Sequence, residues 1–116
     1  MKENVVKSKS FEFAKRIVKL YNYLCDNKKE FVMSKQLLRC GTSVGANIYE
    51  AERGVSKKDF ANKMSIAQKE SNESMYWIEL LYATGYLQEK EYMSLKKECD
   101  EISRLLAAIV KTSFQN

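Results

Sequence analysis

Paired acidic side chains are the pattern in this sequence that comes nearest to a catalytic or metal-binding site. Glu70 and Glu73 stand three residues apart. Glu98 and Glu101 repeat this spacing, which places both carboxylates of a pair on one face of a helix. Helical di-iron sites combine such glutamates with histidine, and this chain contains no histidine. We therefore interpret the pairs as solvated surface groups and expect no metal ion and no other cofactor.

Patterns for nucleophilic catalysis and phosphate binding are also incomplete. A nucleophile at Ser43 would need a base, and the nearest acid along the sequence is Glu50. Gly41 and Gly45 are not followed by the lysine of a phosphate-binding loop. The cysteines are widely spaced and have no histidine to activate them, which favours buried free thiols in a reducing cytoplasm at Cys25, Cys40 and Cys99. The sequence therefore predicts a protein that is not an enzyme.

The elements that position these residues are predicted to be helices. The chain has 116 residues, no proline and 4 glycines, so few residues interrupt a long helix. The expected helices span residues 8–27, 34–53, 56–84 and 88–115. Because the turns between them are short, we expect an all-α, antiparallel up-down-up-down four-helix bundle that forms a single domain over residues 1–116.

Apolar stripes define the core faces of these helices. The stripe of the first helix consists of Phe13, Ile17, Leu20, Tyr21 and Leu24. The third helix has a seam with a small, polar centre: Phe60, Met64, Ala67, Ser71, Ser74, Ile78 and Leu81. The most regular seam belongs to the fourth helix: Tyr92, Leu95, Cys99, Ile102, Leu106 and Ile109. The second helix is expected to bury Leu37, Leu38, Val44 and Ile48.

Local signals mark several helix ends. Ser34 is the expected N-cap of the second helix, and Gly54 is expected to adopt the left-handed conformation after its last turn. Ser56 followed by Asp59 resembles a capping box at the start of the third helix. Gly85 is expected to end that helix. These signals predict the turns on both sides of the second and third helices.

Two glycines four residues apart are the most distinctive feature of the second helix. Gly41 and Gly45 form a G-x-x-x-G pattern, which lets another helix approach closely because two side chains are missing. The favoured interpretation is tight packing inside the bundle. The alternative is a contact between subunits.

A polar stripe lies beside the glycines. Ser43, Asn47 and Glu50 share one side of the second helix, and Glu73 and Trp77 present polar and aromatic groups on the third. Buried polar groups need partners, since each one left unpaired costs about 1–3 kcal/mol. We therefore hypothesise that Asn47 and Glu50 hydrogen-bond to the third helix or to another subunit and fix the register.

The charge of the chain is unevenly distributed. The net charge is +5, and residues 1–55 carry 11 Lys and Arg against 6 Asp and Glu, whereas residues 56–116 carry 9 of each. A basic half is typical of a protein with an anionic partner such as nucleic acid, although a lysine-rich solvated surface is the simpler alternative. The candidate nucleic-acid contacts are Lys15, Arg16, Lys19, Lys35, Arg39, Lys57 and Lys58. Neither a membrane span nor an export signal is visible, so we expect a cytoplasmic protein.

Two stretches of the chain resemble a known family. They are FAKRIVKLYNYL, from Phe13 to Leu24, and the segment from Ser34 to Leu87 that contains CGTSVGANIYEAERG. They are similar to small bacterial four-helix bundle proteins encoded in intervening sequences of large-subunit ribosomal RNA genes, also called S23-type ribosomal proteins. The resemblance covers most of the chain and implies an antiparallel four-helix bundle. The family supplies no established active site to carry over.

Relatives within this resemblance suggest an assembly and partners. Similarity to the accessory proteins of diversity-generating retroelements implies a ring-shaped homopentamer with a basic surface, and those proteins bind a reverse transcriptase and nucleic acid. Our first hypothesis is accordingly a homo-oligomer that binds RNA or DNA with low sequence specificity. The alternative is an adaptor or scaffold for a partner enzyme such as a reverse transcriptase, without nucleic-acid binding of its own.

Overall fold

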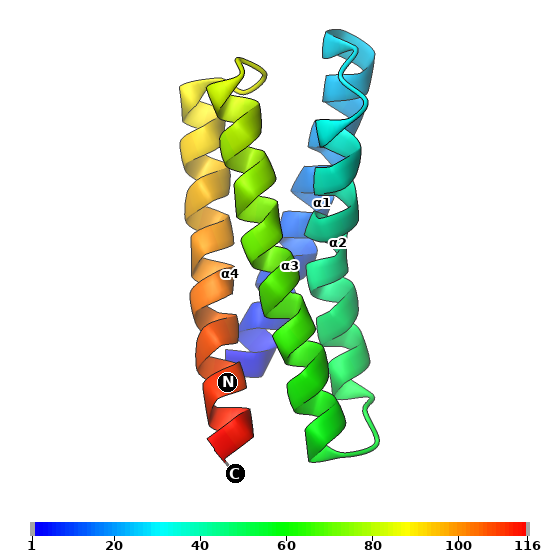
Figure 1. Ribbon diagram of the computed structural model, residues 1–116, viewed down its shortest axis with the longest axis vertical. Helices are drawn as coiled ribbons and strands as arrows, with labels where there is room; N and C mark the ends of the chain where they lie inside the picture. The colour runs from blue at the N-terminus through cyan, green and yellow to red at the C-terminus, as the bar shows by residue number, and fades with distance from the viewer. Residues whose placement is uncertain (1, 116) are drawn as a thin grey trace.

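The computed structural model describes residues 2–115, and these fold into helices joined by short loops (Figure 1). The helices are α1 (Lys2–Lys28), α2 (Met33–Glu52), α3 (Lys57–Ala83) and α4 (Glu89–Gln115). The described part of the chain contains no β-strand, which confirms the expected all-α class.

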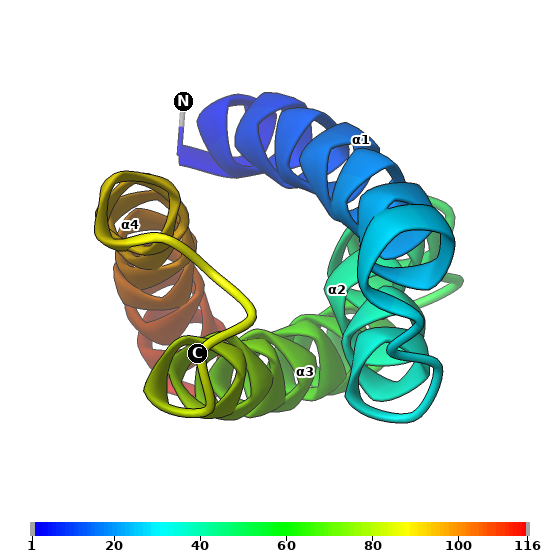
Figure 2. The same ribbon diagram turned by 90° about the horizontal axis from the view of Figure 1, so that it is seen from above.

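Successive helices run in alternating directions, with the α1–α2 and α3–α4 loops at one end and the α2–α3 loop at the other (Figure 1). The bundle is elongated, with extents of 46 × 21 × 18 Å. α1 is inclined to its neighbours, so that its C-terminal end lies beside α2 and away from α4 (Figures 1 and 2). The two hairpins therefore separate at the end where the α1–α2 and α3–α4 loops lie.

The core follows the predicted stripes with a few shifts. All of the predicted seam of α4 is buried. In α3, Ala61 is buried while Phe60 is only partly so, which corrects that position of the seam. Tyr21 of α1 and Leu38 of α2 are also only partly buried, at the edges of their stripes. The remaining residues of the predicted stripes lie in the core.

α1 is longer than the sequence pattern suggested. It begins at Lys2 rather than near Ser8, and its additional turns bury Val6 completely. Ser10 is buried as well and donates a hydrogen bond from its hydroxyl to the carbonyl of Lys7 at 2.9 Å. The first turns are mostly polar, since only one side of each turn faces the bundle. Their composition therefore gave no sign that Val6 and Ser10 are buried.

The start of α2 is capped by Glu30 rather than by Ser34. The Glu30 carboxylate accepts hydrogen bonds from the backbone N–H groups of Val32 (3.1 Å), Met33 (3.0 Å) and Ser34 (2.7 Å). The Ser34 hydroxyl instead donates to the Glu30 carbonyl at 2.7 Å. Burial opposes ionisation of Glu30, but these hydrogen bonds outweigh it and hold its pKa below the ordinary value.

The other helix ends divide between confirmed and corrected predictions. Ser56 caps α3, since its side chain accepts from the Asp59 N–H at 3.1 Å. Gly85 has a φ of 89° and ends α3 in a Schellman motif, with Tyr86 N–H bonded to the Leu81 carbonyl at 2.9 Å. Gly54 is not in the left-handed region, so that expectation is wrong. A side chain there would nevertheless crowd the start of α3, because an added Cβ would lie 3.1 Å from Asp59 Cβ.

A layer of small polar groups crosses the middle of the core. Ser71 and Ser103 share a hydrogen bond of 2.6 Å between their hydroxyls, and Ser74 donates to Cys40 Sγ at 3.3 Å. Cys99 Sγ donates to the Ser71 carbonyl at 3.3 Å. Burial raises the pKa of the Cys40 thiol, and it raises that of Cys99 to about 11. These thiols are therefore protonated at neutral pH, as the prediction of buried free cysteines requires, whereas Cys25 is only partly buried.

Candidate nucleic-acid interface

Ion pairs along the boundary of α1 and α4 use most of the acidic side chains on that side of α4. Arg16 reaches Glu98 at 2.7 Å and Glu91 at 3.5 Å. Lys9 pairs with Glu101 at 3.0 Å. These carboxylates are neutralised by α1 and contribute little negative field to the rest of the surface.

A second group of ion pairs joins α2 and α3. The guanidinium of Arg39 pairs with Glu70 at 3.2 Å and also with Glu73. Glu73 additionally accepts a hydrogen bond from the Trp77 indole N–H at 3.2 Å. Glu50 pairs with Lys63 at 2.9 Å. Arg39 is thus held by two acids.

The acidic pairs singled out in the sequence are therefore not simply solvated. Glu70 and Glu73 bind Arg39, and Glu98 and Glu101 bind Arg16 and Lys9 across helix boundaries. The Glu70 side chain is only 13% exposed. Within residues 2–115, no group of three or more His, Cys, Asp or Glu side chains could hold a metal ion. The role of these carboxylates in the structure is to join helices.

The candidate nucleic-acid contacts fall into two classes. Lys15 pairs with Glu12 within α1 at 3.0 Å, and Arg16 and Arg39 are paired across helices. The other candidates are exposed and form no ion pair with the described residues: Lys19, Lys35, Lys57 and Lys58. They do not form one patch, because Lys35 lies in the first turn of α2 at one end of the bundle and Lys57 begins α3 at the other (Figure 1).

The structure adds a row of cations on α4 that sequence reasoning missed. The row is exposed, and its members lie about 10 Å apart along the helix: Lys90, Lys97, Arg104 and Lys111. Only Arg104 has an ion-pair partner among the described residues, Asp100 at 2.8 Å. The sequence did contain a signal for this row, because its cations recur every seven residues. The equal numbers of acids and bases in residues 56–116 concealed it, because charge totals do not show which acids are already paired.

The two glycines of α2 face α1. An added Cβ at Gly41 would lie 3.0 Å from Ile17 Cγ1, and one at Gly45 would lie 3.4 Å from the Ser10 hydroxyl oxygen. Gly45 also opens a hollow of about 400 Å³ on the outer face of α1 and α2, where Phe11 and Tyr49 line it. Packing inside the chain accounts for Gly41, whereas Gly45 borders an exposed surface.

The polar stripe of α2 behaves only partly as hypothesised. The Asn47 amide donates to the Ser43 carbonyl at 2.9 Å and to the Ser43 hydroxyl at 3.0 Å. These bonds lie within α2, so Asn47 forms no bond to α3, and its bond to another subunit stays a prediction. Glu50 does reach α3, through Lys63. A short polar side chain one turn from its own helix carbonyl finds that partner more readily than a neighbouring helix.

The fold and the distribution of charge define a class of protein, a small all-α bundle. Its acidic side chains join its helices, many of its cations remain exposed, and its described residues contain no cluster that could hold a metal ion. No described helix is long and apolar enough to cross a membrane. The chain belongs to the 23S rRNA-intervening sequence protein family, whose model matches residues 2–108.

A solved structure supports the same assignment. The chain is 57% identical to a protein of unknown function from the S23 ribosomal protein family of Bacteroides thetaiotaomicron VPI-5482, known from a crystal structure. The TM-score is 0.93, and the match covers 96% of this chain and 99% of that one. No match was found among curated protein sequences. The family resemblance inferred from the sequence is therefore confirmed, and the relative's function is unknown.

Proposed function

We propose that this protein is a non-enzymatic, homo-oligomeric bundle of the cytoplasm that binds RNA or DNA through the phosphate backbone with low sequence specificity. The observation that carries the proposal is the separation of paired acids from unpaired cations. Acids such as Glu70 and Glu98 are engaged between helices, while Lys90, Lys97 and Lys111 form no ion pair with the described residues. Exposed lysines of this kind attract phosphates without reading base edges.

A ring-shaped homopentamer is the assembly that we propose. Support comes from the outer face of α1 and α2, where Phe11 is 65% and Tyr49 is 54% exposed beside the Gly45 hollow. Aromatic side chains are enriched at the centres of protein interfaces. Repeating a bundle with several unpaired lysines around a ring would multiply weak phosphate contacts. Native mass spectrometry tests this assembly, and a monomeric mass at micromolar concentration would contradict it.

The binding experiment is a salt titration with matched variants. The test variant replaces Lys90, Lys97 and Lys111 with glutamine. The wild-type affinity for RNA or DNA is expected to fall steeply with salt, and the test variant is expected to lower the slope of log affinity against log salt by about 2 to 3, because it removes that many phosphate contacts.

The matched control removes the same charge from paired lysines. It replaces Lys7, Lys9 and Lys63, which pair with acids at 2.9, 3.0 and 2.9 Å, with glutamine. We expect its salt slope to equal that of the wild type. No binding at about 50 mM salt, or an affinity that does not vary with salt, would refute the proposal. Equal slope changes in both variants would show that net charge alone governs binding.

An adaptor for a partner enzyme is the second candidate, and exposed apolar groups on α3 favour it. Ile66 is 43% and Tyr76 is 58% exposed, and both lie away from the α1–α2 face proposed for assembly. These residues would remain accessible in an oligomer formed through that face. Co-purification from the native cell of one stoichiometric protein partner, with no bound nucleic acid, would favour this candidate over the first.

A further inference from the structure

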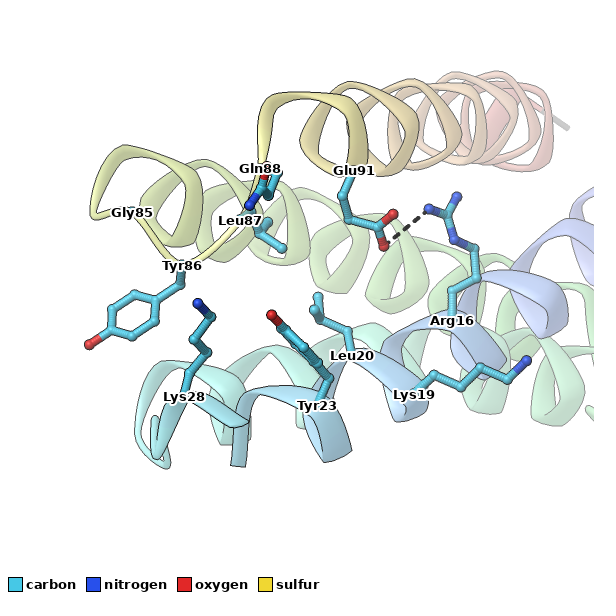
Figure 3. A pocket seen from close by; sticks show the side chains of 10 residues that line it. All are labelled: Arg16, Lys19, Leu20, Tyr23, Lys28, Gly85, Tyr86, Leu87, Gln88 and Glu91. Carbon is cyan, nitrogen blue, oxygen red and sulfur yellow. Dashed lines mark ion pairs between the residues drawn. The ribbon is translucent and has the colours of Figure 1, made fainter. Parts of the chain in front are cut away.

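A cavity of about 370 Å³ lies where α1 diverges from the α3–α4 hairpin (Figure 3). Side chains from α1, from α4 and from the α3–α4 loop line it: Arg16, Lys19, Leu20, Tyr23, Lys28, Gly85, Tyr86, Leu87, Gln88 and Glu91. Its volume lies in the range of small-molecule binding sites. Elements distant in the sequence thus converge on one site.

The cavity has an excess of positive charge. Its lining contains one carboxylate, Glu91, which is already paired with Arg16 at 3.5 Å. Lys19 and Lys28 form no ion pair with the described residues. Figure 3 shows the Lys28 side chain extending between Tyr23 and Tyr86. The Lys19 side chain extends away from the tyrosines (Figure 3), so the wall offers the Lys28 ammonium group to an anion.

The tyrosines of the cavity have no partners in the described part of the chain. Tyr23 and Tyr86 make neither a hydrogen bond through the side chain nor a contact with another ring. By contrast, Tyr82 and Tyr92 stack on one another nearby, with ring centroids 4.0 Å apart. An aromatic face left unstacked beside a free cation suits a planar, anionic ligand.

The wall of the cavity is fixed by the local fold. The left-handed Gly85 turns the chain, and hydrogen bonds from Gly85 and Tyr86 back to the last turn of α3 hold the loop, at 3.1 and 2.9 Å. Leu87 and Leu20 are buried and provide an apolar surface behind the tyrosines. The site is therefore formed before any ligand binds, which reduces the entropy lost on binding.

We propose that this cavity binds a nucleotide, with the base against Tyr23 and Tyr86 and the phosphate near Lys28. The inference rests on the proposed function and adds to it a preference for unpaired nucleotides. A base inside a duplex is stacked between its neighbours and cannot enter, whereas a base in a single strand or loop is free to do so. The ligand is either a nucleotide within a strand or a free mononucleotide, because both present the same chemistry.

The experiment compares a single strand with a duplex of the same sequence, each carrying the fluorescent base 2-aminopurine. The wild type is expected to bind the single strand more tightly and to quench its fluorescence by stacking. Tyr23→Ala and Tyr86→Ala should each weaken single-strand binding by about tenfold and leave duplex binding unchanged. Tyr23→Phe retains the ring and should bind normally. Tyr76→Ala, which removes an exposed tyrosine of α3 away from the cavity, should also bind normally.

The outcomes separate this inference from the proposed function. Equal affinity for single strand and duplex, with no effect of Tyr23→Ala or Tyr86→Ala, overturns the nucleotide site and leaves backbone binding intact. Binding of adenosine monophosphate that shifts the NMR signals of Gly85 and Tyr86, without any binding of strands, supports the site and refutes the proposed function. Displacement of the labelled strand from the cavity by polyglutamate but not by mononucleotides assigns the site to an acidic peptide and overturns the inference. Circular dichroism melting of each variant confirms that it is folded.

Discussion

α1 meets its two neighbouring helices in different ways. Against α2 the contact is close and largely apolar, because Gly41 has no side chain to separate its backbone from Ile17. Against α4 the contact depends on long charged side chains, with Arg16 reaching Glu98 and Lys9 reaching Glu101. Figure 2 shows the consequence, since the C-terminal end of α1 lies beside α2 and away from α4.

The difference separates two roles along one helix. The α1–α2 boundary holds the hairpin together through shape, which tolerates little change in volume. At the α1–α4 boundary the acidic side chains form ion pairs with α1. The cavity lies at the end of this boundary where α1 diverges from α4. A helix packed as closely on α4 as on α2 would leave no room for the nucleotide site.

Enlarging Gly41 is expected to cause the largest effect. In Gly41→Val the new Cβ would lie 3.0 and 3.1 Å from Ile17 Cγ1 and Cγ2, and Ile17 is itself buried and branched at Cβ. Since neither side chain can move without shifting a helix, we expect the free energy of unfolding to fall by about 2–3 kcal/mol. Urea denaturation measures this change, and a variant as stable as the wild type would show that the contact is not tight.

Gly45→Ala is the matched control in the same pattern. Its new Cβ would lie 3.4 Å from the Ser10 hydroxyl oxygen, which is an ordinary contact distance. Replacing glycine by alanine inside a helix favours folding by up to about 1 kcal/mol. We therefore expect Gly45→Ala to be as stable as the wild type or slightly more stable. With the same substituent at both positions, Gly41→Ala should destabilise where Gly45→Ala does not, because its new Cβ would lie 3.0 Å from Ile17 Cγ1.

The core could be predicted from the sequence where side chains repeat at regular spacings. The seam from Tyr92 to Ile109 is an example, since its spacing of three and four residues fixes which face of α4 is buried. The distance between helices could not be predicted in the same way. The G-x-x-x-G pattern predicted a close approach, but only the structure shows that Gly41 meets Ile17 while Gly45 borders an open hollow.

Removing the Glu30 carboxylate should have the next largest effect, because it also secures the α1–α2 hairpin. Glu30→Ala leaves the N–H groups of Val32, Met33 and Ser34 without their acceptor. We expect a loss of about 1 kcal/mol at pH 7, a typical value for a helix cap. Thermal and urea unfolding of the wild type and the variant measure the difference.

The pH dependence of that difference provides a second check. The pKa of Glu30 is lower in the folded protein than in the unfolded chain, so its stabilisation is fully present above about pH 5 and is lost as the pH falls through the folded pKa. The stability difference between the wild type and Glu30→Ala should therefore shrink as the pH falls through the folded pKa of Glu30. Glu30→Gln retains one acceptor and should be intermediate. A difference that stayed constant while the Glu30 carboxyl became protonated would mean that charge plays no part in the cap.

Neither the Glu30 cap of α2 nor the cavity was predicted from the sequence, and the reasons are similar. Glu30 can cap α2 because Lys29 adopts a left-handed conformation with a φ of 53°, which is rare for lysine and leaves no sequence signal. The cavity likewise requires Tyr23 of α1 to lie near Tyr86 of the α3–α4 loop. Helical periodicity assigns a residue to a face but does not say how far two hairpins diverge. Both features therefore depend on tertiary geometry.

Disrupting the charged boundary of α1 and α4 should have the smallest effect on stability. Arg16→Met keeps most of the side-chain volume and removes the pairs with Glu98 and Glu91. Because the pairs are partly exposed, we expect a loss of about 0.5–1 kcal/mol in dilute buffer that decreases toward about 1 M salt. Lys15→Met, which breaks only the pair with Glu12 inside α1, is the control and should change stability less.

Arg16→Met should weaken nucleotide binding in the cavity more than it lowers the stability of the fold. Without Arg16, the Glu91 carboxylate on the cavity wall loses its positive partner and remains there as an unneutralised charge. We therefore expect Arg16→Met to weaken nucleotide binding by more than its loss of stability would suggest, with Glu91→Gln in the same chain restoring it. Isothermal titration with a single strand measures both variants. If Glu91→Gln failed to restore binding, the role of Arg16 would be direct contact with the phosphate rather than neutralisation of Glu91.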